Sequence, residues 1–315
     1  MSMEDKDGWI WMDGHWQPWR EARLHVMTHT LHYGLGCFEG IRAYATDSGP
    51  AIFRLDDHIE RLFESAAILG LPMPFTPGVL RDACLEAVRR NNLEAGYVRP
   101  LVYLGAEKAG VDPTGAQTHV MIAAWAWGAY LGGEALERGI RVKVSSFARH
   151  HVNAQMCRAK SVSGYTNSIL ACREARADGY DEALLLDTDG FVAEGPGENV
   201  FIVKRGQIIE PAITAALDGI TRRTIVALTA DAGIPMITRR VTRDELYTAD
   251  EIFFTGTAAE VTPVIEVDRR PVGSRHPGPI TRALQQSYFE CVQGRVAARS
   301  SWLSAVNSAH PRHFN

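Results

Sequence analysis

Four short segments of the chain contain residue types that could hold and activate one small ligand. Lys160 is followed by a polar stretch, and Glu194 lies in a loop rich in glycine and proline. Two glycine-containing turns follow, Gly219-Ile220-Thr221 and Gly256-Thr257. A lysine amine attacks aldehydes, a carboxylate keeps a ring nitrogen protonated, and backbone N–H groups at turns bind phosphate. These groups together predict an aromatic aldehyde that carries a phosphate.

Pyridoxal 5′-phosphate has each of these features, and we expect it to be the cofactor. Lys160 would form the Schiff base, because a partly desolvated lysine more readily frees its amine for attack. Glu194 would hold the ring nitrogen, so that the ring withdraws electrons from the carbon being deprotonated. Glu198 is a weaker candidate for the same role. Taken alone, a lysine or a loop glutamate is more often a solvated surface group.

The two turns are the expected phosphate site. Gly219 lies just before a predicted helix at 221–232, where free N–H groups and the helix dipole favour a dianion. The Thr221 hydroxyl adds a donor, and Gly256-Thr257 follows a predicted strand at 251–254. A Gly-x-Thr sequence before a helix is also an ordinary helix start, so this assignment depends on the other motifs.

A second group of residues suits the substrate. Tyr97 and Arg99 lie on one face of a predicted strand, and an arginine with a tyrosine binds a carboxylate well. Phe38, Trp127 and Tyr130 could form an apolar pocket. A strand that faces water, and aromatic residues that only fill a core, would explain the same patterns.

His29 and His32 have the spacing of a metal pair, but no other ligand cluster stands near them in the sequence. Histidines at such positions are usually structural, and we therefore predict no metal site.

Composition narrows the class of protein. The chain has 315 residues, an apolar fraction of 46% and a formal net charge of −4. These values suit a globular protein of one large or two modest domains without a basic field for nucleic acid. No apolar run is long enough for a membrane span, and the N-terminus lacks a signal peptide pattern. Five widely spaced cysteines without a C-x-x-C pair favour reduced thiols and a cytoplasmic location.

Periodicity predicts helices and strands in both halves of the chain. Thr76 is a plausible N-cap and Pro77 a plausible first residue of a helix. The expected elements, by residue number, are a hairpin at 9–16, helices at 56–69, 77–88, 165–177, 221–232 and 280–292, and strands at 97–104, 119–127, 140–144, 183–186, 200–203 and 251–254. The tail after Gly294 has weak periodicity, and we expect it to be poorly ordered or packed against a partner.

Taken together, the motifs resemble those of branched-chain amino acid aminotransferases in the fold-type IV class of pyridoxal-phosphate enzymes. The resemblance covers residues 9–292, nearly the whole chain. The segments that carry it are His32-Tyr33-Gly34, Cys37 to Arg42, Tyr97-Val98-Arg99-Pro100, Trp127 to Tyr130, Ala159-Lys160, the Glu194 loop, Gly219 to Arg222, and Thr255 to Pro263.

The resemblance implies an α+β fold with two domains, the larger having a barrel-like β core flanked by helices. We expect a small domain at 1–127, an interdomain loop at 128–136, a large cofactor-binding domain at 137–295 and a C-terminal tail at 296–315.

It also implies roles for single residues. Tyr165 would contact the oxygen on the cofactor ring, and Arg61 would join Ile220, Thr221, Gly256 and Thr257 at the phosphate. The substrate α-carboxylate would meet Tyr97, Thr257 and Ala258, and the second carboxylate of glutamate would meet Arg99. The apolar pocket would consist of Phe38, Trp127, Tyr130 and Tyr165. Tyr33 and Val111 would reach the site from a second subunit, so the minimal active unit would be a homodimer, with a larger assembly such as a hexamer possible.

The predicted reaction moves an amino group from leucine, isoleucine or valine to 2-oxoglutarate. Within the same fold, a D-amino acid transaminase, an amine transaminase or an aminodeoxychorismate lyase would share the lysine and the glutamate. A non-catalytic cofactor binder or an oligomeric scaffold would require a broken site, and the sequence contains none.

Overall fold

The computed structural model describes residues 2–128 and 131–307. The chain forms two compact units. Unit 1 contains residues 1–67, 71–127 and 290–315, and unit 2 contains residues 68–70 and 128–289. The range 128–136, which we expected to be an interdomain loop, contains four of the six residues of a short helix, α4 (Gly133–Arg138).

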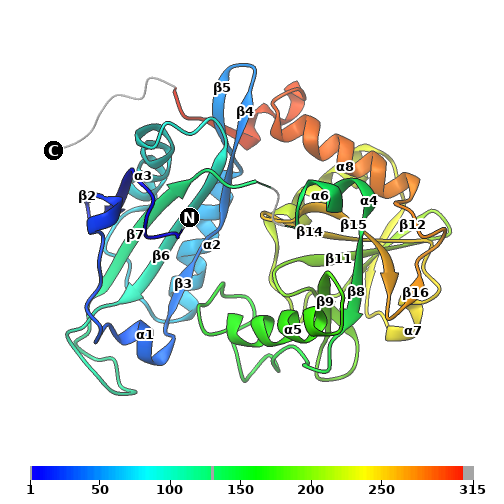
Figure 1. The fold of residues 1–315 in the computed structure, drawn as a ribbon, viewed down its shortest axis with the longest axis horizontal. Coiled ribbons are helices and arrows are strands. Elements are labelled where there is room, and N and C mark those ends of the chain that lie inside the picture. The colour runs from blue at the N-terminus through cyan, green and yellow to red at the C-terminus, as the bar shows by residue number, and fades with distance from the viewer. Residues whose placement is uncertain (1, 129–130, 308–315) are drawn as a thin grey trace. The chain divides into compact units, whose positions relative to one another are not determined.

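Unit 1 is built on one antiparallel sheet with the strand order β17-β5-β4-β6-β7-β1-β2, and β3 pairs with β6 beside this path (Figure 1). Its strands are β1 (Trp9–Met12), β2 (His15–Pro18), β3 (Gly36–Phe38), β4 (Ile41–Thr46), β5 (Gly49–Phe53), β6 (Gly96–Leu104), β7 (Thr118–Trp125) and β17 (Leu303–Ala305). Its helices are α1 (His29–Tyr33), α2 (Leu55–Ile68) and α3 (Pro77–Arg90), and two 3-10 turns span Trp19–Glu21 and Ala297–Trp302.

The start of α3 follows from its sequence. Thr76 has extended backbone angles, and its side chain accepts a hydrogen bond from the N–H of Val79 at 3.4 Å. Pro77 follows as the first helical residue. A backbone N–H at this position would have no acceptor within the helix, so the lack of one in proline costs no hydrogen bond. The predicted apolar face, which includes Leu80, Cys84 and Val88, is buried. The predicted cap and core face of this helix are therefore confirmed.

Two features of unit 1 differ from expectation. Helix α2 begins at Leu55, because Arg54 adopts the left-handed region with φ 52° and turns the chain into the helix. Asp56 therefore lies in the first turn of the helix. Residues 295–307 are also more regular than predicted, since β17 pairs with β5 through Leu303↔Phe53 and Ala305↔Ala51. Weak periodicity concealed this strand because three residues are too few to display a period.

Unit 2 contains a nine-stranded sheet with the order β10-β9-β8-β15-β14-β11-β12-β13, and β16 pairs with β15 beside this path. The strands are β8 (Ile140–Val144), β9 (Glu182–Leu186), β10 (Val192–Glu194), β11 (Asn199–Lys204), β12 (Gln207–Pro211), β13 (Met236–Arg239), β14 (Glu251–Gly256), β15 (Glu260–Val267) and β16 (Arg270–Pro271). The helices are α4, α5 (Tyr165–Ala177), α6 (Ile220–Asp231), α7 (Arg243–Leu246) and α8 (Pro279–Val292).

The two ends of this sheet meet. Phe191, just before β10, forms an antiparallel bridge with Thr242, which follows β13. The N–H of Val192 donates to the carbonyl oxygen of Val241 at 2.8 Å. Contact between the first and last strands of a sheet closes it into a barrel-like form. The barrel-like core implied by the resemblance is thus confirmed.

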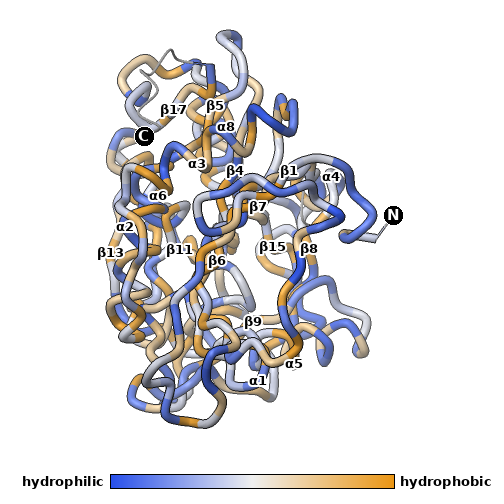
Figure 2. The backbone as a smooth tube through the Cα atoms, turned by 90° about the vertical axis from the view of Figure 1, so that its left-hand side faces the viewer, coloured by the Kyte–Doolittle hydropathy of each residue, from blue (hydrophilic) through white to orange (hydrophobic). Residues whose placement is uncertain are grey.

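Alternating side chains divide the sheet of unit 2 into an inner and an outer layer. Val142, Leu184, Ile202 and Phe254 belong to one buried apolar cluster. Residues of the other parity face the helices: Ala183 and Leu185 of β9 pack with Ala171 and Ala175 of α5. Such alternation is the period of a strand that is buried on both faces. In unit 1 hydrophobic residues likewise recur along β6 and β7 (Figure 2).

All five cysteines are free thiols. Within residues 2–128 and 131–307, no helix is both long enough and apolar enough to cross a membrane.

Candidate active site

Lys160 and Tyr165 are joined at the entrance to α5. The Nζ atom of Lys160 donates to the phenol oxygen of Tyr165 at 2.7 Å, and it lies 5.2 Å from the centre of the ring. Both side chains are half-buried. The amine is therefore held beside a hydroxyl group that can exchange a proton with it.

Glu194 ends β10 with its carboxylate buried and held on both oxygens. Nη2 of Arg149 lies 2.8 Å from Oε1, and the N–H of Leu217 donates to Oε2 at 3.1 Å. Burial raises the pKa of Glu194, while the charges of Arg149 and Lys160 and the Leu217 hydrogen bond oppose this rise. The net shift is upward, so the Arg149 cation, the Lys160 charge and the Leu217 hydrogen bond offset only part of the cost of burying this charge.

Sequence reasoning did not single out Arg149, which is 9% exposed and also donates from Nε to the carbonyl oxygen of Ala215 at 3.3 Å. Arg149 and Glu194 are far apart in the chain, and only the fold brings them together. The one signal in the sequence was the basic run Arg149-His150-His151, which lies in the irregular segment between β8 and Lys160.

Glu198 differs from Glu194 in its electrostatic surroundings. It is buried, and its Oε2 accepts a hydrogen bond from the N–H of Gly197 at 3.0 Å. Burial, together with the charges of Glu182 and Glu194, raises the pKa of Glu198 to about 8. A carboxyl with that pKa is mostly protonated at neutral pH, so the structure favours Glu194 as the carboxylate beside a cationic ring.

The N-terminus of α6 is open toward an anion. Gly219 is its N-cap and supplies no side-chain hydrogen bond to the helix. A Cβ atom on Gly219 would lie 2.0 Å from Oδ1 of Asn199, so a larger residue would have to displace that side chain. The N–H groups of the first turn, from Ile220 and Thr221 onward, have no acceptor within the helix and favour a negative charge.

The second turn lies at the end of β14, next to the Glu194 loop. Thr255 pairs with Asn199 across β14 and β11, and a Cβ atom on Gly256 would lie 3.1 Å from the carbonyl oxygen of Gly197. The buried Oγ1 of Thr255 has no hydrogen-bond partner among the described residues. Thr257 and Ala258 follow in the turn between β14 and β15.

Contacts connect these loops of unit 2. Asn199 donates from Nδ2 to the carbonyl oxygen of Leu217 at 2.9 Å, and Leu217 in turn contacts Glu194. Nη1 of Arg158, two residues before Lys160, lies 3.6 Å from Oδ2 of Asp218. The fold therefore brings the lysine, the acid and both predicted phosphate turns into one region.

Four predicted substrate residues gather in unit 1. The guanidinium carbon of Arg99 lies 4.6 Å from the centre of the Phe38 ring and 5.4 Å from that of Tyr97. Tyr97 packs edge-on against Trp127, with ring centres 4.6 Å apart. The buried Nε of Arg99 has no acceptor within the described part of the chain. Tyr130 lies outside the described residues.

Arg61 is buried on α2 and forms a bidentate pair with Glu39. Its Nε and Nη2 atoms donate to the two carboxylate oxygens at 2.7 and 2.9 Å, and Nδ1 of His58 lies 2.7 Å from Oε2. Burial alone would raise the pKa of Glu39, but the charges of Arg61 and His58 outweigh it and hold that pKa well below its usual range. The phosphate role expected of Arg61 stays a prediction.

Tyr33 is bonded to Gly110, the residue that precedes Val111 in the chain. The N–H of Gly110 donates to the phenol oxygen of Tyr33 at 3.1 Å, and Nε2 of His29 lies 2.8 Å from the carbonyl oxygen of Gly110. Val111 is 89% exposed and Tyr33 47% exposed. His29 therefore has a structural role, as does His32, whose Nε2 contacts the carbonyl oxygen of Val26 at 2.9 Å.

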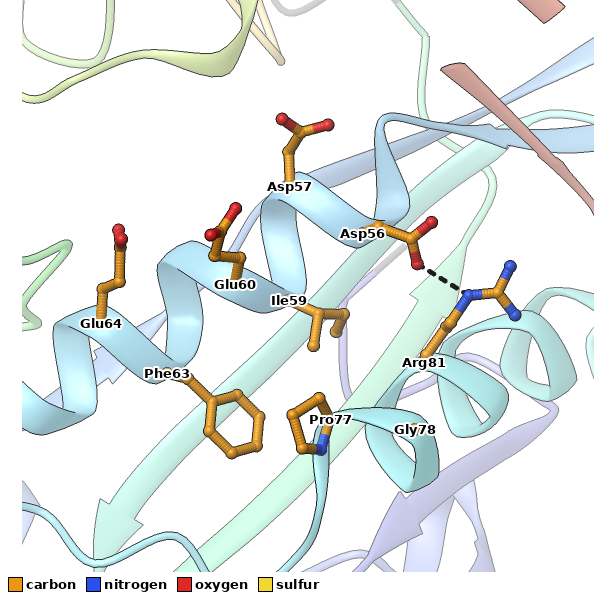
Figure 3. Close-up of a pocket in the computed structure, with 9 residues that line it drawn as sticks. All are labelled: Asp56, Asp57, Ile59, Glu60, Phe63, Glu64, Pro77, Gly78 and Arg81. Atoms are coloured by element: carbon orange, nitrogen blue, oxygen red, sulfur yellow. Dashed lines mark hydrogen bonds and ion pairs between the residues drawn. The ribbon is translucent and has the colours of Figure 1, made fainter. Parts of the chain in front are cut away.

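A separate pocket lies between α2 and α3 in unit 1. Figure 3 shows the carboxylates of Asp57, Glu60 and Glu64 projecting from α2, while Arg81 pairs with Asp56 at 2.8 Å. None of the residues that line it is a predicted site residue.

Comparison with known proteins decides the family. The sequence profile described as amino-transferase class IV matches residues 36–267. The chain belongs to the class IV aminotransferases. It is therefore an enzyme of the transferase class, and aminotransferases of this fold type bind pyridoxal phosphate.

This aminotransferase resembles proteins that carry a more specific name. It is 54% identical over 306 residues to the branched-chain-amino-acid aminotransferase of Pseudomonas aeruginosa, an alignment that covers 97% of this chain and 100% of that protein. A crystal structure of the Escherichia coli branched-chain amino acid aminotransferase matches with a TM-score of 0.94 at 44% identity, covering 96% of this chain and 100% of that one. A crystal structure of the branched-chain amino acid aminotransferase from Thermoproteus uzoniensis with norvaline matches with a TM-score of 0.91 at 42% identity, covering 96% and 100% of the two chains.

The residues of this aminotransferase fit pyridoxal phosphate. The amine of Lys160, the buried carboxyl of Glu194 and the N-terminus of α6 have the chemistry that its aldehyde, ring nitrogen and phosphate would need. At Gly219 and Gly256 the chain passes close to Asn199 and Gly197, which is why a residue with a Cβ atom would be crowded at both turns. No group of three or more potential metal ligands occurs among the described residues.

Proposed function

We propose that this aminotransferase transfers the amino group of leucine, isoleucine or valine to 2-oxoglutarate, with pyridoxal 5′-phosphate as its cofactor. The observation that supports the proposal is that Lys160, Tyr165 and the Arg149–Glu194 pair lie in one unit together with the two turns proposed to bind phosphate. Relatives over 97% and 96% of the chain that bear the branched-chain name support the choice of substrate.

When bound, pyridoxal phosphate supplies an aldehyde for the amine and a ring that accepts electrons from the substrate Cα. With the cofactor bound, the Nζ atom of Lys160 would take the proton from the substrate Cα and hold it for return to the cofactor side. Tyr165 holds that amine in place between the two transfers. Glu194 keeps the ring nitrogen protonated, and Arg149 keeps Glu194 ionised although burial disfavours its charge.

Binding of the phosphate is assigned to Arg61, to the first turn of α6 at Gly219, Ile220 and Thr221, and to Gly256 and Thr257. The fixed N–H groups of such turns bind a dianion without side-chain reorganisation.

The substrate side must accept an apolar chain and a carboxylate in turn. We assign Tyr97, Thr257 and Ala258 to the α-carboxylate, and Phe38, Trp127, Tyr130 and Tyr165 to the walls. Arg99 lies over the ring of Phe38, so its guanidinium is beside an aromatic surface and still able to pair with the second carboxylate of glutamate.

We propose that a homodimer is the minimal active unit and that Tyr33 and Val111 reach the site of the second subunit. The exposure of both residues, and of Val26 and Leu31 near them, supports an interface. Sedimentation should give twice the mass of the chain or a multiple of that. We also propose a cytoplasmic location, which suits five free thiols.

Absorption spectroscopy tests the proposed reaction. Titration with L-leucine should convert the visible spectrum of the holoenzyme, and 2-oxoglutarate should restore it. A panel of D-amino acids and simple amines should produce no comparable change. Borohydride reduction should attach the cofactor to Lys160, and Lys160→Ala should abolish turnover. A colourless protein, or a label on another residue, would refute the proposal.

A further inference from the structure

Three polar side chains form a closed network in the segment that carries Lys160. Nε2 of Gln155 donates to Oγ of Ser161 at 2.8 Å and to Oγ of Ser163 at 3.1 Å. The two serine hydroxyls lie 3.1 Å apart, and the N–H of Gly164 donates to Ser161 at 3.2 Å. Ser161 is buried, and Gln155 and Ser163 are half-buried.

Counting donors and acceptors fixes the direction of each bond. The Nε2 group of Gln155 has two hydrogens, and both are used. Ser161 accepts from Gln155 and Gly164, which occupies its two lone pairs, so its own hydrogen must go to Ser163. Ser163 then accepts two bonds. The three side chains are linked pairwise, and a hydrogen-bonded group of this kind favours one loop conformation.

The network holds the four residues between Lys160 and Tyr165. Helix α5 has Gly164 as its N-cap, which offers no side chain to cap the helix. Ser161 instead anchors this end of the helix by accepting the Gly164 N–H, and Asn167 in the first turn donates to the carbonyl oxygen of Ala148 at 2.8 Å. The start of α5, and with it Tyr165, is therefore fixed relative to Lys160.

We propose that Gln155 is a positioning residue which, through Ser161 and Ser163, sets the 2.7 Å contact between the Lys160 amine and the Tyr165 phenol. The inference rests on the proposed function, because the contact between Lys160 and Tyr165 affects catalysis only if Lys160 transfers the proton. Without the network, the connecting loop samples other conformations, and the amine spends less time at the required position.

The experiment compares Gln155→Ala, Ser161→Ala and the conservative Ser161→Thr with a control, Gln207→Ala, at the β11–β12 turn of the same unit. In the cofactor-free protein, hydrogen exchange at Gly164 should accelerate about fivefold in Gln155→Ala and Ser161→Ala, as expected for the loss of one or two net hydrogen bonds. Ser161→Thr and Gln207→Ala should match the wild type. In the holoenzyme, kcat should fall by about fivefold to tenfold with KM changed less than about twofold.

The pH at which the bound cofactor changes its absorbance should also shift in the two alanine variants of the network. Wild-type exchange at Gly164 together with wild-type kcat in Gln155→Ala would overturn the inference. If Gln155→Ala fails to fold, a comparison of Ser161→Ala with Ser161→Thr, by hydrogen exchange at Gly164 and by kcat, decides instead. A wild-type protein that borohydride does not label at Lys160 would instead refute the proposed function, while the exchange data would still decide whether the network orders the loop.

Discussion

The Nη2 atom of Arg149 lies 2.8 Å from Oε1 of Glu194, and the two residues are 9% and 5% exposed. Each charge in this pair lacks water and depends on the other. The pair therefore decides whether Glu194 can remain an anion, which is the state that the proposed chemistry requires.

Arg149→Met should damage both stability and cofactor binding. It removes the cation but keeps a long, unbranched side chain, so Glu194 stays buried without a compensating charge. Breaking one side of a buried pair costs about 3–5 kcal/mol. We expect a loss of this order in the free energy of unfolding by urea, and cofactor affinity lower by about tenfold or more. Arg141→Met, at an exposed ion pair with Asp181, should cost at most about 1 kcal/mol.

A second substitution separates charge from packing. Adding Glu194→Gln to Arg149→Met removes the uncompensated charge and should recover part of the lost stability without recovering activity. If the double variant is less stable than Arg149→Met, the loss comes from packing and the electrostatic explanation is wrong.

Glu198 should make stability depend on pH. Its pKa is raised from 4.5 to about 8 in the folded chain, so the folded state holds a proton that the unfolded state releases. The stabilisation is present below pH about 4.5 and is lost as pH rises through about 8, with a slope of up to about 1.4 kcal/mol per pH unit. Between pH 5 and 8, the wild type should lose more unfolding free energy than Glu198→Gln. Parallel curves would show that Glu198 is ionised throughout.

Gly219→Ala should weaken binding of the cofactor phosphate. The new Cβ atom would lie 2.0 Å from Oδ1 of Asn199, which must move together with the start of α6. We expect affinity for pyridoxal phosphate to fall about tenfold or more, with a smaller change for pyridoxal, which has no phosphate. Gly133→Ala is the control, since its Cβ atom meets nothing within 4 Å. Equal losses for both ligands would mean that this turn does not bind the phosphate.

Arg99→Ala should affect the two substrates unequally. In the proposed site leucine would use the aromatic walls, whereas glutamate and 2-oxoglutarate would also need the guanidinium. A lost charge-assisted pair corresponds to about 1.5–3 kcal/mol, or about tenfold to hundredfold in kcat/KM, for the two dicarboxylates. Leucine turnover, measured in a single half-reaction, should change by less than about threefold. Similar losses for all substrates would contradict a pocket shared by both chain types.

The sequence predicted much of the local structure because local signals dominated there. Thr76 and Pro77 mark the start of α3, and the helix at 165–177 has the predicted bounds. The hairpin at the N-terminus turns at Asp13 and Gly14, both with positive φ, as an Asp-Gly pair allows. Short elements such as β17 escaped prediction because their pairing partner, β5, lies far away in the chain.

By itself the sequence determined which groups are present: one lysine before a helix, an acid in a glycine-rich loop and two turns that expose backbone N–H groups. Residue types and their order along the chain are enough for that inference, because the reactivity of an amine, a carboxyl group or an N–H group follows from its own atoms. Only the tertiary structure decided the electrostatics, because charges act over distances in space. It placed Arg149 on Glu194, gave Glu198 a pKa of about 8, and closed the network of Gln155 around the lysine loop.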